Sequence, residues 1–574
     1  VGQLAKTVEQ HAAGNPLFAQ QIVGELVQRG ALVDRGQGFA LRPGAELVLP
    51  EDLVQGWLAR TETLLQGRPP VEATLLGLAA RLGTRVESRE WIYAARAWGL
   101  PADGLEETCS SLVERLARRN LARRKPQGWY FEHGMLREAI LRREQALGRS
   151  PALHLACALG LKLRYGDAPD RQERLGRHFV GAGQPEQAIA PLVQAYLYAR
   201  SSQDLESVSG LVKARMNAMS LAGVATEDPR WIRGWMAASF VARSAGHFQQ
   251  HRRVLRKALK LAERGGHEML SVRILRHKAE GERQEGHTAV ARAHFDEVLP
   301  RVQALGDRLL EAKIVEGQAN CARQLHQAEE AGALIVKAQR LFIEVGDLAG
   351  QATCHRGLGN LARNRGELKT AVLEVTRALS IYKRIGQRLG MANCLNDIGD
   401  FHRFEGHQDA AKNAYKRSWA LYDSIGSYAA VFARFNLSLL HLTARAYVPC
   451  AKDLERLLSA SGQAGLVLLR PGIQLALTAC MAAEQNWTRF HALVLQARAD
   501  LEASGDLDHD NAWPAQVAGE LAQAAGRPDL ARLAYEVALH QFVGIGAQVR
   551  EGQVRALIQG LDESESAPLS PGNV

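Results

Sequence analysis

The sequence predicts a mostly α-helical protein whose larger part is a solenoid of stacked helical hairpins. One observation is a pattern that returns every 40 residues, in about eight copies, between residues 229 and 560. The other is amphipathic spacing inside the copies, as in Leu368, Val372, Val375 and Leu379. A single hairpin cannot bury its apolar face, whereas stacked hairpins can. The pattern therefore predicts a helical solenoid with a groove that is open to partners.

Each copy reads as a helix, a short turn and a second helix. The turns are expected at Gly246, Gly286, His326, Gly366, Gly406, Ala446, Asn486 and Gly526. Seven positions before each turn stands a column of mostly small residues, which includes Gly359 and Gly399 and is interrupted by Leu439. Small residues there allow the two helices of a hairpin to approach closely. A glycine between copies, such as Gly386, can take the left-handed conformation that ends a helix.

The first 146 residues lack this period and are expected to form different domains. Residues 1–66 read as a helical segment with a break at Gly14 and a new helix from Pro16, where the missing N–H of proline costs nothing. Residues 67–146 read as three short helices, two strands joined by a turn, and a further helix. Three helices with a β-wing are the outline of a winged helix.

The remaining segments are less regular. Residues 147–228 contain hairpin-like helices with looser spacing and form an irregular start to the array. Residues 561–574 are polar, contain proline and serine, and are expected to be disordered.

Composition narrows the class of protein. The chain has 574 residues and a formal net charge of +10, but basic and acidic residues are interspersed, which gives no argument for nucleic-acid binding. The seven cysteines form no C-x-x-C pair, which is typical of a reducing cytoplasm. No apolar run reaches the roughly 18 residues that a membrane span requires. Because the chain opens with Val1 inside helical sequence, we expect a fragment of a longer protein.

Several phrases in the sequence resemble known families. The segments 358–382 and 398–422 resemble tetratricopeptide repeats (TPR), lengthened from the usual 34 residues to 40. Three phrases resemble the lid and winged helix of STAND-class signalling ATPases, which are related to AAA ATPases. They are "GNPLF" at 14–18, "LPEDL" at 49–53, and Phe131 and His133 followed by "LRE" at 136–138, with a one-residue difference in spacing. The absence of a C-terminal DNA-binding helix-turn-helix favours the branch with an upstream Ser/Thr protein kinase.

This resemblance implies that the chain supplies some residues of a nucleotide site, and that the rest of the site belongs to another domain. In the family, the Gly-x-Pro phrase touches the adenine and a comparable histidine reaches the diphosphate of ADP, which would assign Gly14, Pro16 and His133 as nucleotide contacts. The chain has no Gly-Lys dipeptide of a P-loop and no H-R-D or D-F-G phrase of a kinase. ATP or ADP with magnesium is therefore expected only in a longer parent, and this chain alone is expected to bind no cofactor.

No catalytic or metal site is expected in the sequence. His247 and His251 have the spacing of two ligands on one helix face but lack a third, and Asp506, Asp508 and Asp510 read as a solvated turn that lacks the distal glutamate of a calcium loop. A basic cluster between Arg115 and Lys125 is expected to be solvated or to make contacts within the ATPase.

The leading hypothesis is the regulatory half of a bacterial STAND-type ATPase, with a protein partner or a small inducer in the solenoid groove. A second basic stripe is a candidate for partner binding, with a plain wet surface as the alternative; it consists of Arg252, Arg253, Arg256 and Lys257. Two other functions stay open at this point. One is a free-standing TPR adaptor, and the other is a transcription regulator that uses the winged helix on DNA.

Overall fold

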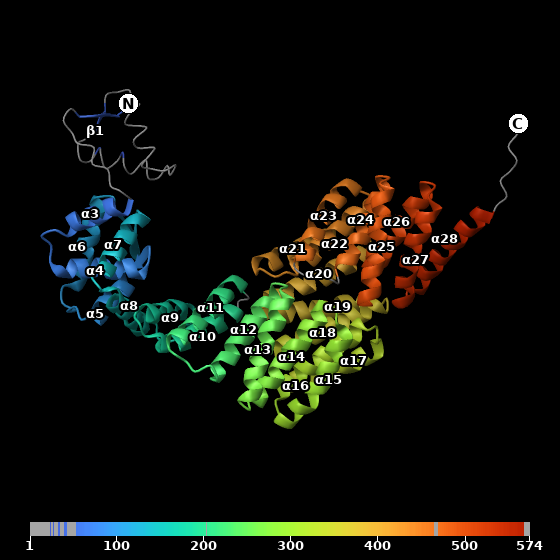
Figure 1. The fold of residues 1–574 in the computed structure, drawn as a ribbon, viewed down its shortest axis with the longest axis horizontal. Coiled ribbons are helices and arrows are strands. Elements are labelled where there is room, and N and C mark those ends of the chain that lie inside the picture. Colours follow the sequence, from blue (N-terminus) through green and yellow to red (C-terminus); the bar gives the residue numbers. More distant parts are fainter. Residues whose placement is uncertain are drawn as a thin grey trace. The chain divides into compact units, whose positions relative to one another are not determined.

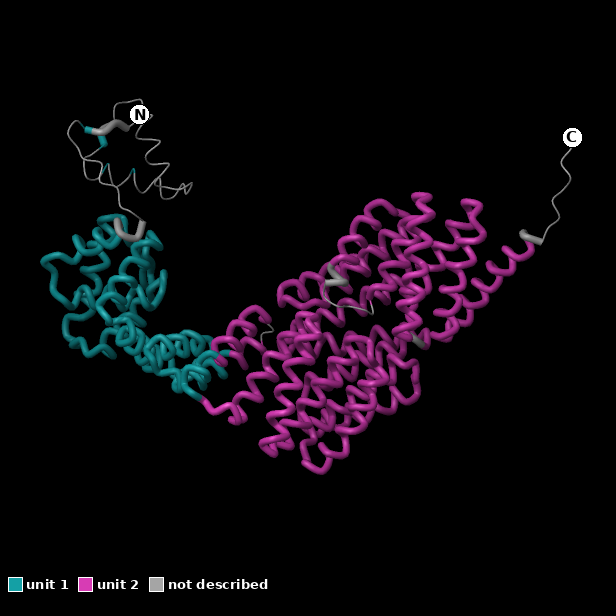
Figure 2. Tube along the Cα trace, in the orientation of Figure 1, with its two compact units in different colours: residues 1–195, 217–223 teal, residues 196–216, 224–574 magenta. Residues whose placement is uncertain are grey.

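The structure is a computed structural model that describes residues 53–201, 204–463 and 469–566, together with residues 23, 27, 32–34 and 39–42. The chain divides into two compact units (Figure 2). Unit 1 comprises residues 1–195 and 217–223, and unit 2 comprises residues 196–216 and 224–574. Helices predominate in the described part of both units. All strands of the described residues lie in unit 1 (Figure 1).

Unit 1 begins, in its described part, with a short antiparallel pair of strands, β1 (Leu32–Asp34) and β2 (Phe39–Leu41). The elements that follow are α3 (Leu53–Leu65), α4 (Pro70–Leu82), β3 (Arg85–Glu87), α5 (Ser88–Ala97), α6 (Leu105–Arg118), β4 (Ala122–Lys125), β5 (Gly128–Phe131), α7 (Gly134–Ala146), α8 (Ser150–Tyr165), a 3-10 turn (Pro169–Arg171), α9 (Gln172–Gly181) and α10 (Pro185–Ser201), of which residues 196–201 belong to unit 2.

Strands β3, β4 and β5 form an antiparallel sheet in the order β3-β5-β4 against helices α4, α5 and α6. Val86 lies opposite Trp129 in this sheet, and both side chains are buried. The Trp91 ring packs edge-on at 5.5 Å from that of Trp129, and its Nε1 donates to the Leu75 carbonyl at 2.7 Å. Three helices and the β4–β5 wing are the elements that the sequence predicted here. The short strand β3 was not predicted.

Helix α11 (Leu205–Leu221) precedes an array of helical hairpins in unit 2. Each hairpin consists of a first helix, here called inner, and a second helix, here called outer. The pairs are α12 (Pro229–Ser244) with α13 (Phe248–Arg264), α14 (Glu268–Glu285) with α15 (Thr288–Leu305), α16 (Arg308–Gln324) with α17 (Ala328–Glu344), α18 (Leu348–Asn364) with α19 (Leu368–Arg384), α20 (Arg388–Phe404) with α21 (Gln408–Ser424), α22 (Ala430–Thr443) with α23 (Tyr447–Gln463), α24 (Arg470–Ala483) with α25 (Trp487–Ser504), and α26 (His509–Ala524) with α27 (Pro528–Gly544). Helix α28 (Gln548–Ser566) follows, and the array confirms the predicted helical solenoid.

The small-residue column lies where the two helices of a hairpin touch. A Cβ atom built on Gly399 would stand 2.4 Å from Cε1 of Tyr415, and one on Gly359 would stand 2.6 Å from Cγ2 of Val375. Both distances are shorter than any real van der Waals contact. The predicted close approach of the helices is therefore present in these hairpins.

All eight predicted turn positions lie in the short segments between the two helices of a hairpin. At six of them the residue has positive φ, whereas in the other two repeats the left-handed residues are Arg445 and Gln485, one position before Ala446 and Asn486. In those two repeats the inner helices α22 and α24 end one position earlier than α20 does. With this shift, Ser438 and not Leu439 faces the outer helix, where its carbonyl accepts from Sγ of Cys450 at 3.3 Å.

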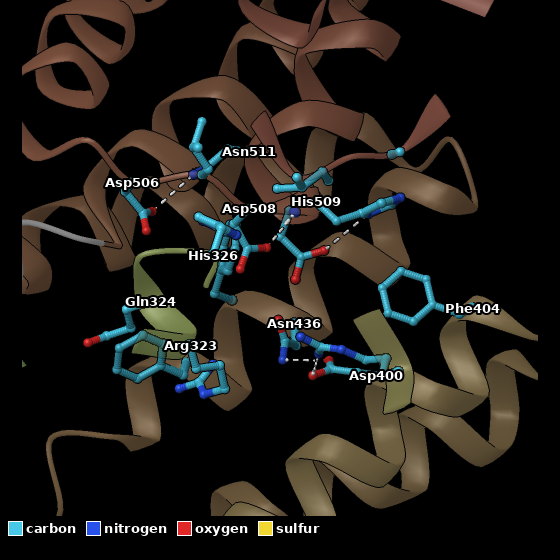
Figure 3. A pocket seen from close by; sticks show the side chains of 18 of the residues that line it. Arg323, Gln324, His326, Asp400, Phe404, Asn436, Asp506, Asp508, His509 and Asn511 are labelled. Carbon is cyan, nitrogen blue, oxygen red and sulfur yellow. Dashed lines mark hydrogen bonds and ion pairs between the residues drawn. The ribbon is translucent and has the colours of Figure 1, made fainter. Parts of the chain in front are cut away.

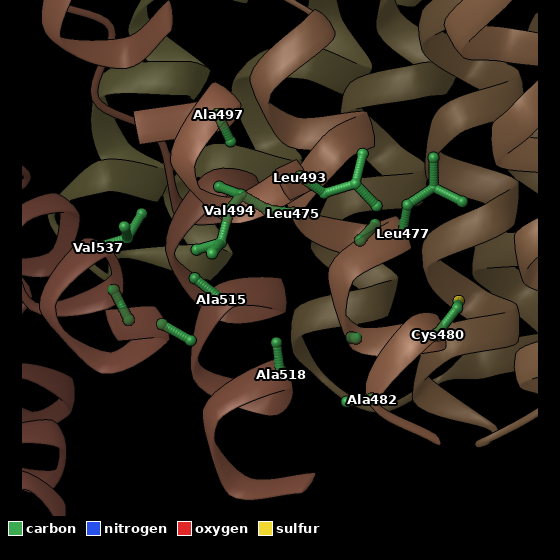
Figure 4. Packing of buried hydrophobic residues seen from close by; sticks show 14 of the residues in the cluster. Leu475, Leu477, Cys480, Ala482, Leu493, Val494, Ala497, Ala515, Ala518 and Val537 are labelled. Carbon is green, nitrogen blue, oxygen red and sulfur yellow. The ribbon is translucent and has the colours of Figure 1, made fainter. Parts of the chain in front are cut away.

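The last hairpins share a large apolar core that includes Leu475, Leu493 and Ala515 (Figure 4). Helix α28 packs on it through Leu561, which is 2% exposed. The disorder expected from residue 561 is therefore wrong for residues 561–566, because Leu561 is held in this core. Residues 567–574 lie outside the described residues.

All seven cysteines are buried and free, as expected of small apolar side chains in a reduced protein. Within the described residues, no helix has the length and apolar character that crossing a membrane requires.

Candidate functional site

The inner helices of unit 2 line a cavity of about 590 Å³ (Figure 3). Its walls come from the ends of α16 and α18, from α20 and α22, from the start of α24, and from the loops before α26 and α28. The outer helices contribute only Leu368, at the start of α19. The cavity is therefore a property of the stacked array and not of any single hairpin.

The array winds so that distant repeats meet across this cavity. Arg403 on α20 donates to Oδ1 of Asp510 at 2.6 Å, although the two residues are 107 positions apart. Farther along the same inner surface, the backbone N–H of Tyr428 donates to the carbonyl of Ser244 at 3.4 Å, and the Tyr428 ring lies 6.2 Å from that of Phe248. These contacts close the inner surface into a walled cavity.

One arginine recurs every 40 residues in the last turn of the inner helices. The arginine column consists of Arg243, Arg283, Arg323, Arg363 and Arg403. Four of the five have a carboxylate partner. Glu280 pairs with Arg283 at 2.7 Å and with Arg243 at 3.9 Å. Asp400 pairs with Arg363 at 3.5 Å and with Arg403 at 3.9 Å.

Arg323 is the central member of the column, and its side chain lines the cavity without a hydrogen bond or ion pair to any described residue. Burial, together with the nearby Arg283, Arg356 and Arg363, lowers the pKa of its guanidinium to about 10. Asp397, which acts in the opposite direction, is itself bound by Arg356 at 2.5 Å. Arg323 is thus a half-buried cation that the protein leaves uncompensated.

An acidic wall is formed by the loop between α25 and α26. Burial, together with the negative charge of Asp508, raises the pKa of Asp506 to about 6. Asp506 accepts a hydrogen bond from Nδ2 of Asn511 at 3.1 Å, and Asp508 caps α26 by accepting from the backbone N–H of Asp510 at 2.8 Å. The expectation of a plain solvated turn is wrong for Asp506 and Asp510, because the winding of the array buries this loop against α16 and α20.

Aromatic side chains complete the cavity. Phe404, Phe432 and Phe435 line it, and the Phe404 ring packs edge-on at 5.0 Å from the ring of His509. A concave site with an apolar wall and a few convergent polar groups is the usual form of a small-molecule site.

The basic stripe predicted for partner binding lies on α13, an outer helix that does not contribute to the cavity. Arg252 pairs with Glu285, and Nζ of Lys257 lies 4.3 Å from the centre of the Trp235 ring. Arg253 and Arg256 are exposed. The structure therefore leaves two of the four predicted residues without a described contact and places none of them in the cavity.

The predicted nucleotide contacts lie in unit 1. Gly14 and Pro16 are outside the described residues. His133 directly precedes α7, is half-buried, and has its ring 5.4 Å from that of Trp57. In the basic cluster, Arg115 pairs with Glu72 at 2.5 Å and Arg118 with Glu114 at 2.7 Å. These two contacts lie within residues 67–146.

Two groupings were missed in the sequence. The arginine column was readable from its 40-residue spacing alone. The second is a cluster with metal-ligating side chains, His402 in the last turn of α20 and Glu405 and His407 in the turn that follows. Of the two histidines whose spacing was read in the sequence as chance, His251 is buried and bonded to Oγ of Ser239 at 2.9 Å.

No protein-family model matches the chain, and no curated protein matches it. Among solved structures, a STAND protein with a tetratricopeptide repeat sensor from Pyrococcus horikoshii matches with a TM-score of 0.44 and 13% identity, covering 85% of this chain and 69% of its own. A Rap protein complexed with competence and sporulation factor matches with a TM-score of 0.42 and 10% identity, covering 66% and 98%. The apo form of the quorum sensor NprR from B. thuringiensis matches with a TM-score of 0.35 and 12% identity, covering 66% and 99%. At these identities the similarity concerns the fold alone.

Proposed function

We propose that unit 2 is the ligand-binding sensor of a cytoplasmic signalling regulator, and that its ligand, a small inducer or part of a protein partner, enters the cavity of the inner helices. The observation that carries this proposal is the cavity itself, with Arg323 left without a partner in its wall. Its volume of about 590 Å³ lies within the usual range of ligand sites.

The position of the cavity also suits a sensor. Its walls belong to inner helices of several hairpins that are far apart in sequence. A ligand that contacts them all would favour one winding of the array over another, because a ligand shifts a conformational equilibrium by its difference in affinity for the two states. In this proposal the chain itself is not an enzyme, and ligand occupancy is its input.

The finer proposal concerns the output. By resemblance, the lid and winged helix would relay occupancy to a P-loop core, with Gly14, Pro16 and His133 against ATP or ADP and magnesium. A Ser/Thr kinase domain would be encoded farther upstream in the parent. Peptide coverage of the native protein in its source cells tests this. Peptides of a P-loop domain upstream of Val1 would support it. A native start at Val1 would contradict it and favour the adaptor.

The sensor role is tested by a variant that fills the cavity. Ala547 lines the cavity in the turn before α28, and Ala547→Trp occupies the space without removing a polar side chain. Ala328→Trp is the matched control, at an exposed first position of the outer helix α17. The readout is hydrogen–deuterium exchange of the full chain with the low-molecular-weight extract of its source cells.

We expect the extract to slow exchange in α16, α20 and α26 of the wild type and of the Ala328→Trp protein, but not of the Ala547→Trp protein. Equal protection in all three proteins would contradict a ligand site in this cavity, and no protection of the wild type would contradict a small inducer as its ligand.

A further inference from the structure

We propose that the cavity takes a zwitterionic ligand, whose carboxylate is bound by Arg323 and whose amino group lies beside Asp506 and Asp508. This inference rests on the proposed sensor function and names the chemical class of the ligand.

The arginine column shows why Arg323 is available. Every other arginine of the column pairs with a carboxylate that stands either three positions before it or 37 positions after it. These two places are equivalent positions in consecutive repeats, because they are 40 residues apart. Glu280 stands three before Arg283 and 37 after Arg243, and Asp400 has the same relation to Arg403 and Arg363. For Arg323 both of these places hold asparagine, Asn320 and Asn360. The repeat thus provides a carboxylate for four arginines and withholds it from the fifth.

One of these two asparagines also has a buried polar atom without a hydrogen-bond partner. Asn360 is 7% exposed, and its Oδ1 has no hydrogen-bond partner. A buried polar atom without a partner and an uncompensated cation are both costly in the ligand-free protein. A ligand carboxylate would remove the larger cost, since a guanidinium binds a carboxylate through two parallel N–H donors.

The opposite wall has the complementary charge. Figure 3 shows Asp506 and Asp508 on the side formed by the α25–α26 loop, and Arg323 on the side formed by α16. Asp510 in the same loop is bound by Arg403, whereas Asp506 and Asp508 have no ion pair with arginine or lysine in the described structure. The His326 imidazole interacts electrostatically with Asp508, and burial lowers the pKa of His326. A ligand ammonium would meet two carboxylates that have no arginine or lysine partner among the described residues.

The distribution of charge therefore selects the ligand. A simple anion would satisfy Arg323 but face two aspartates, and a simple cation would face the arginine column. A molecule with both groups satisfies both walls, and an apolar part between them would contact Phe404 and Phe435. Free amino acids and short peptides with free termini share this chemistry.

The test is a thermal-shift titration of the full chain with four pools: free amino acids, tripeptides with free termini, the same tripeptides amidated at the C-terminus, and the same tripeptides acetylated at the N-terminus. We expect one of the first two pools to stabilise the wild type. The pool that does so shows whether the ligand is a free amino acid or a short peptide. Amidation and acetylation should each weaken the effective affinity about tenfold or more, since each removes a charged partner of a hydrogen bond.

Two variants connect the effect to Arg323. Arg323→Gln should lose the response to the stabilising pool. Asn320→Glu places a carboxylate where Glu280 stands relative to Arg283, so it should occupy Arg323 from within and block the ligand although the arginine is still present. Asn320→Gln has the same length without the charge and should respond like the wild type.

The outcomes separate the inference from the proposed function. Equal responses to free and modified pools, or a normal response of Arg323→Gln, would overturn the assignment of the charges. Protection of the inner helices by the cell extract, with no response to any pool, would overturn the zwitterion and leave the sensor function standing. Loss of the extract effect as well would contradict both the zwitterion and a small inducer as the ligand.

Discussion

Arg323 differs from the other arginines of its column only in its neighbours. At the residue scale, the same side chain in the same turn of the same helix is an internal ion-pair partner in four repeats and an open cation in one. The difference is set by Asn320 and Asn360, which replace the carboxylates of the neighbouring repeats. Because these two side chains are uncharged, Arg323 remains available as a binding group in the cavity.

Asp506 gives a test of the acidic wall by pH. Its folded pKa of about 6 lies above the roughly 3.9 of an unfolded aspartate, so the folded protein holds this proton more tightly between about pH 4 and pH 6. The stability that this group contributes is consequently lost as the pH rises through that window. The side chain of Asp506→Asn does not titrate, so the variant does not lose this stability as the pH rises. Its amide oxygen can still accept the hydrogen bond from Nδ2 of Asn511.

We expect the free energy of unfolding of Asp506→Asn, relative to wild type, to rise by about 1 kcal/mol between pH 4 and pH 7. Urea denaturation at the two pH values measures this difference. If the difference in the free energy of unfolding between the variant and the wild type were the same at pH 4 and pH 7, Asp506 would titrate as an exposed carboxylate.

At the scale of the element, the hairpin depends on the small column between its two helices. Gly399→Ala would put a Cβ 2.4 Å from the Tyr415 ring, and we expect a loss of about 2 kcal/mol in the free energy of unfolding. Gly332→Ala on α17 is the control, because its Cβ would have 3.8 Å to Cδ1 of Leu361. That change should be neutral or stabilise by up to about 1 kcal/mol.

Urea unfolding of the two variants checks this pair of predictions. If Gly399→Ala were as stable as Gly332→Ala, the two helices would not be in contact at the column, and the assigned register of the repeat would be wrong.

The elements were largely predictable because they depend on local chemistry. Turn glycines and small residues repeat at fixed spacing, and this placed the hairpins correctly. The position of the left-handed residue at Arg445 and Gln485 could not be read in this way, since neither residue has a special preference for a left-handed backbone and the 40-residue period pointed one position later. Strand β3 was missed because three residues are too short to show a period.

At the scale of the whole of unit 2, the cavity depends on how the array winds. The contact between Arg403 and Asp510 joins α20 to α26, and it buries both charges. No spacing in the sequence reports this contact, because stacking of neighbouring repeats does not fix how far the array turns. The arginine column was visible in the sequence, but the acidic wall opposite Arg323 was not.

Asp510→Asn tests this closure. It leaves Arg403 buried with a weakened partner, and we expect a loss of about 3 kcal/mol in the free energy of unfolding, together with faster hydrogen exchange in α26. Asp529→Asn is the control, since Asp529 pairs with Arg527 at the surface, with side-chain exposures of 62% and 37%, and should cost no more than about 0.5 kcal/mol. Equal small losses in both variants would mean that the winding does not depend on this ion pair.

The most direct test of the account is the interaction energy between residues 320 and 323, measured without any ligand. A double-mutant cycle compares Asn320→Glu with Asn320→Gln, each with Arg323 and with Arg323→Gln, by urea denaturation. If Arg323 is an uncompensated cation, the glutamate should stabilise the protein relative to glutamine by about 1 to 3 kcal/mol, and only when Arg323 is present. An interaction energy near zero would show that Arg323 already has its charge satisfied, and it would contradict the central role of this residue in the cavity.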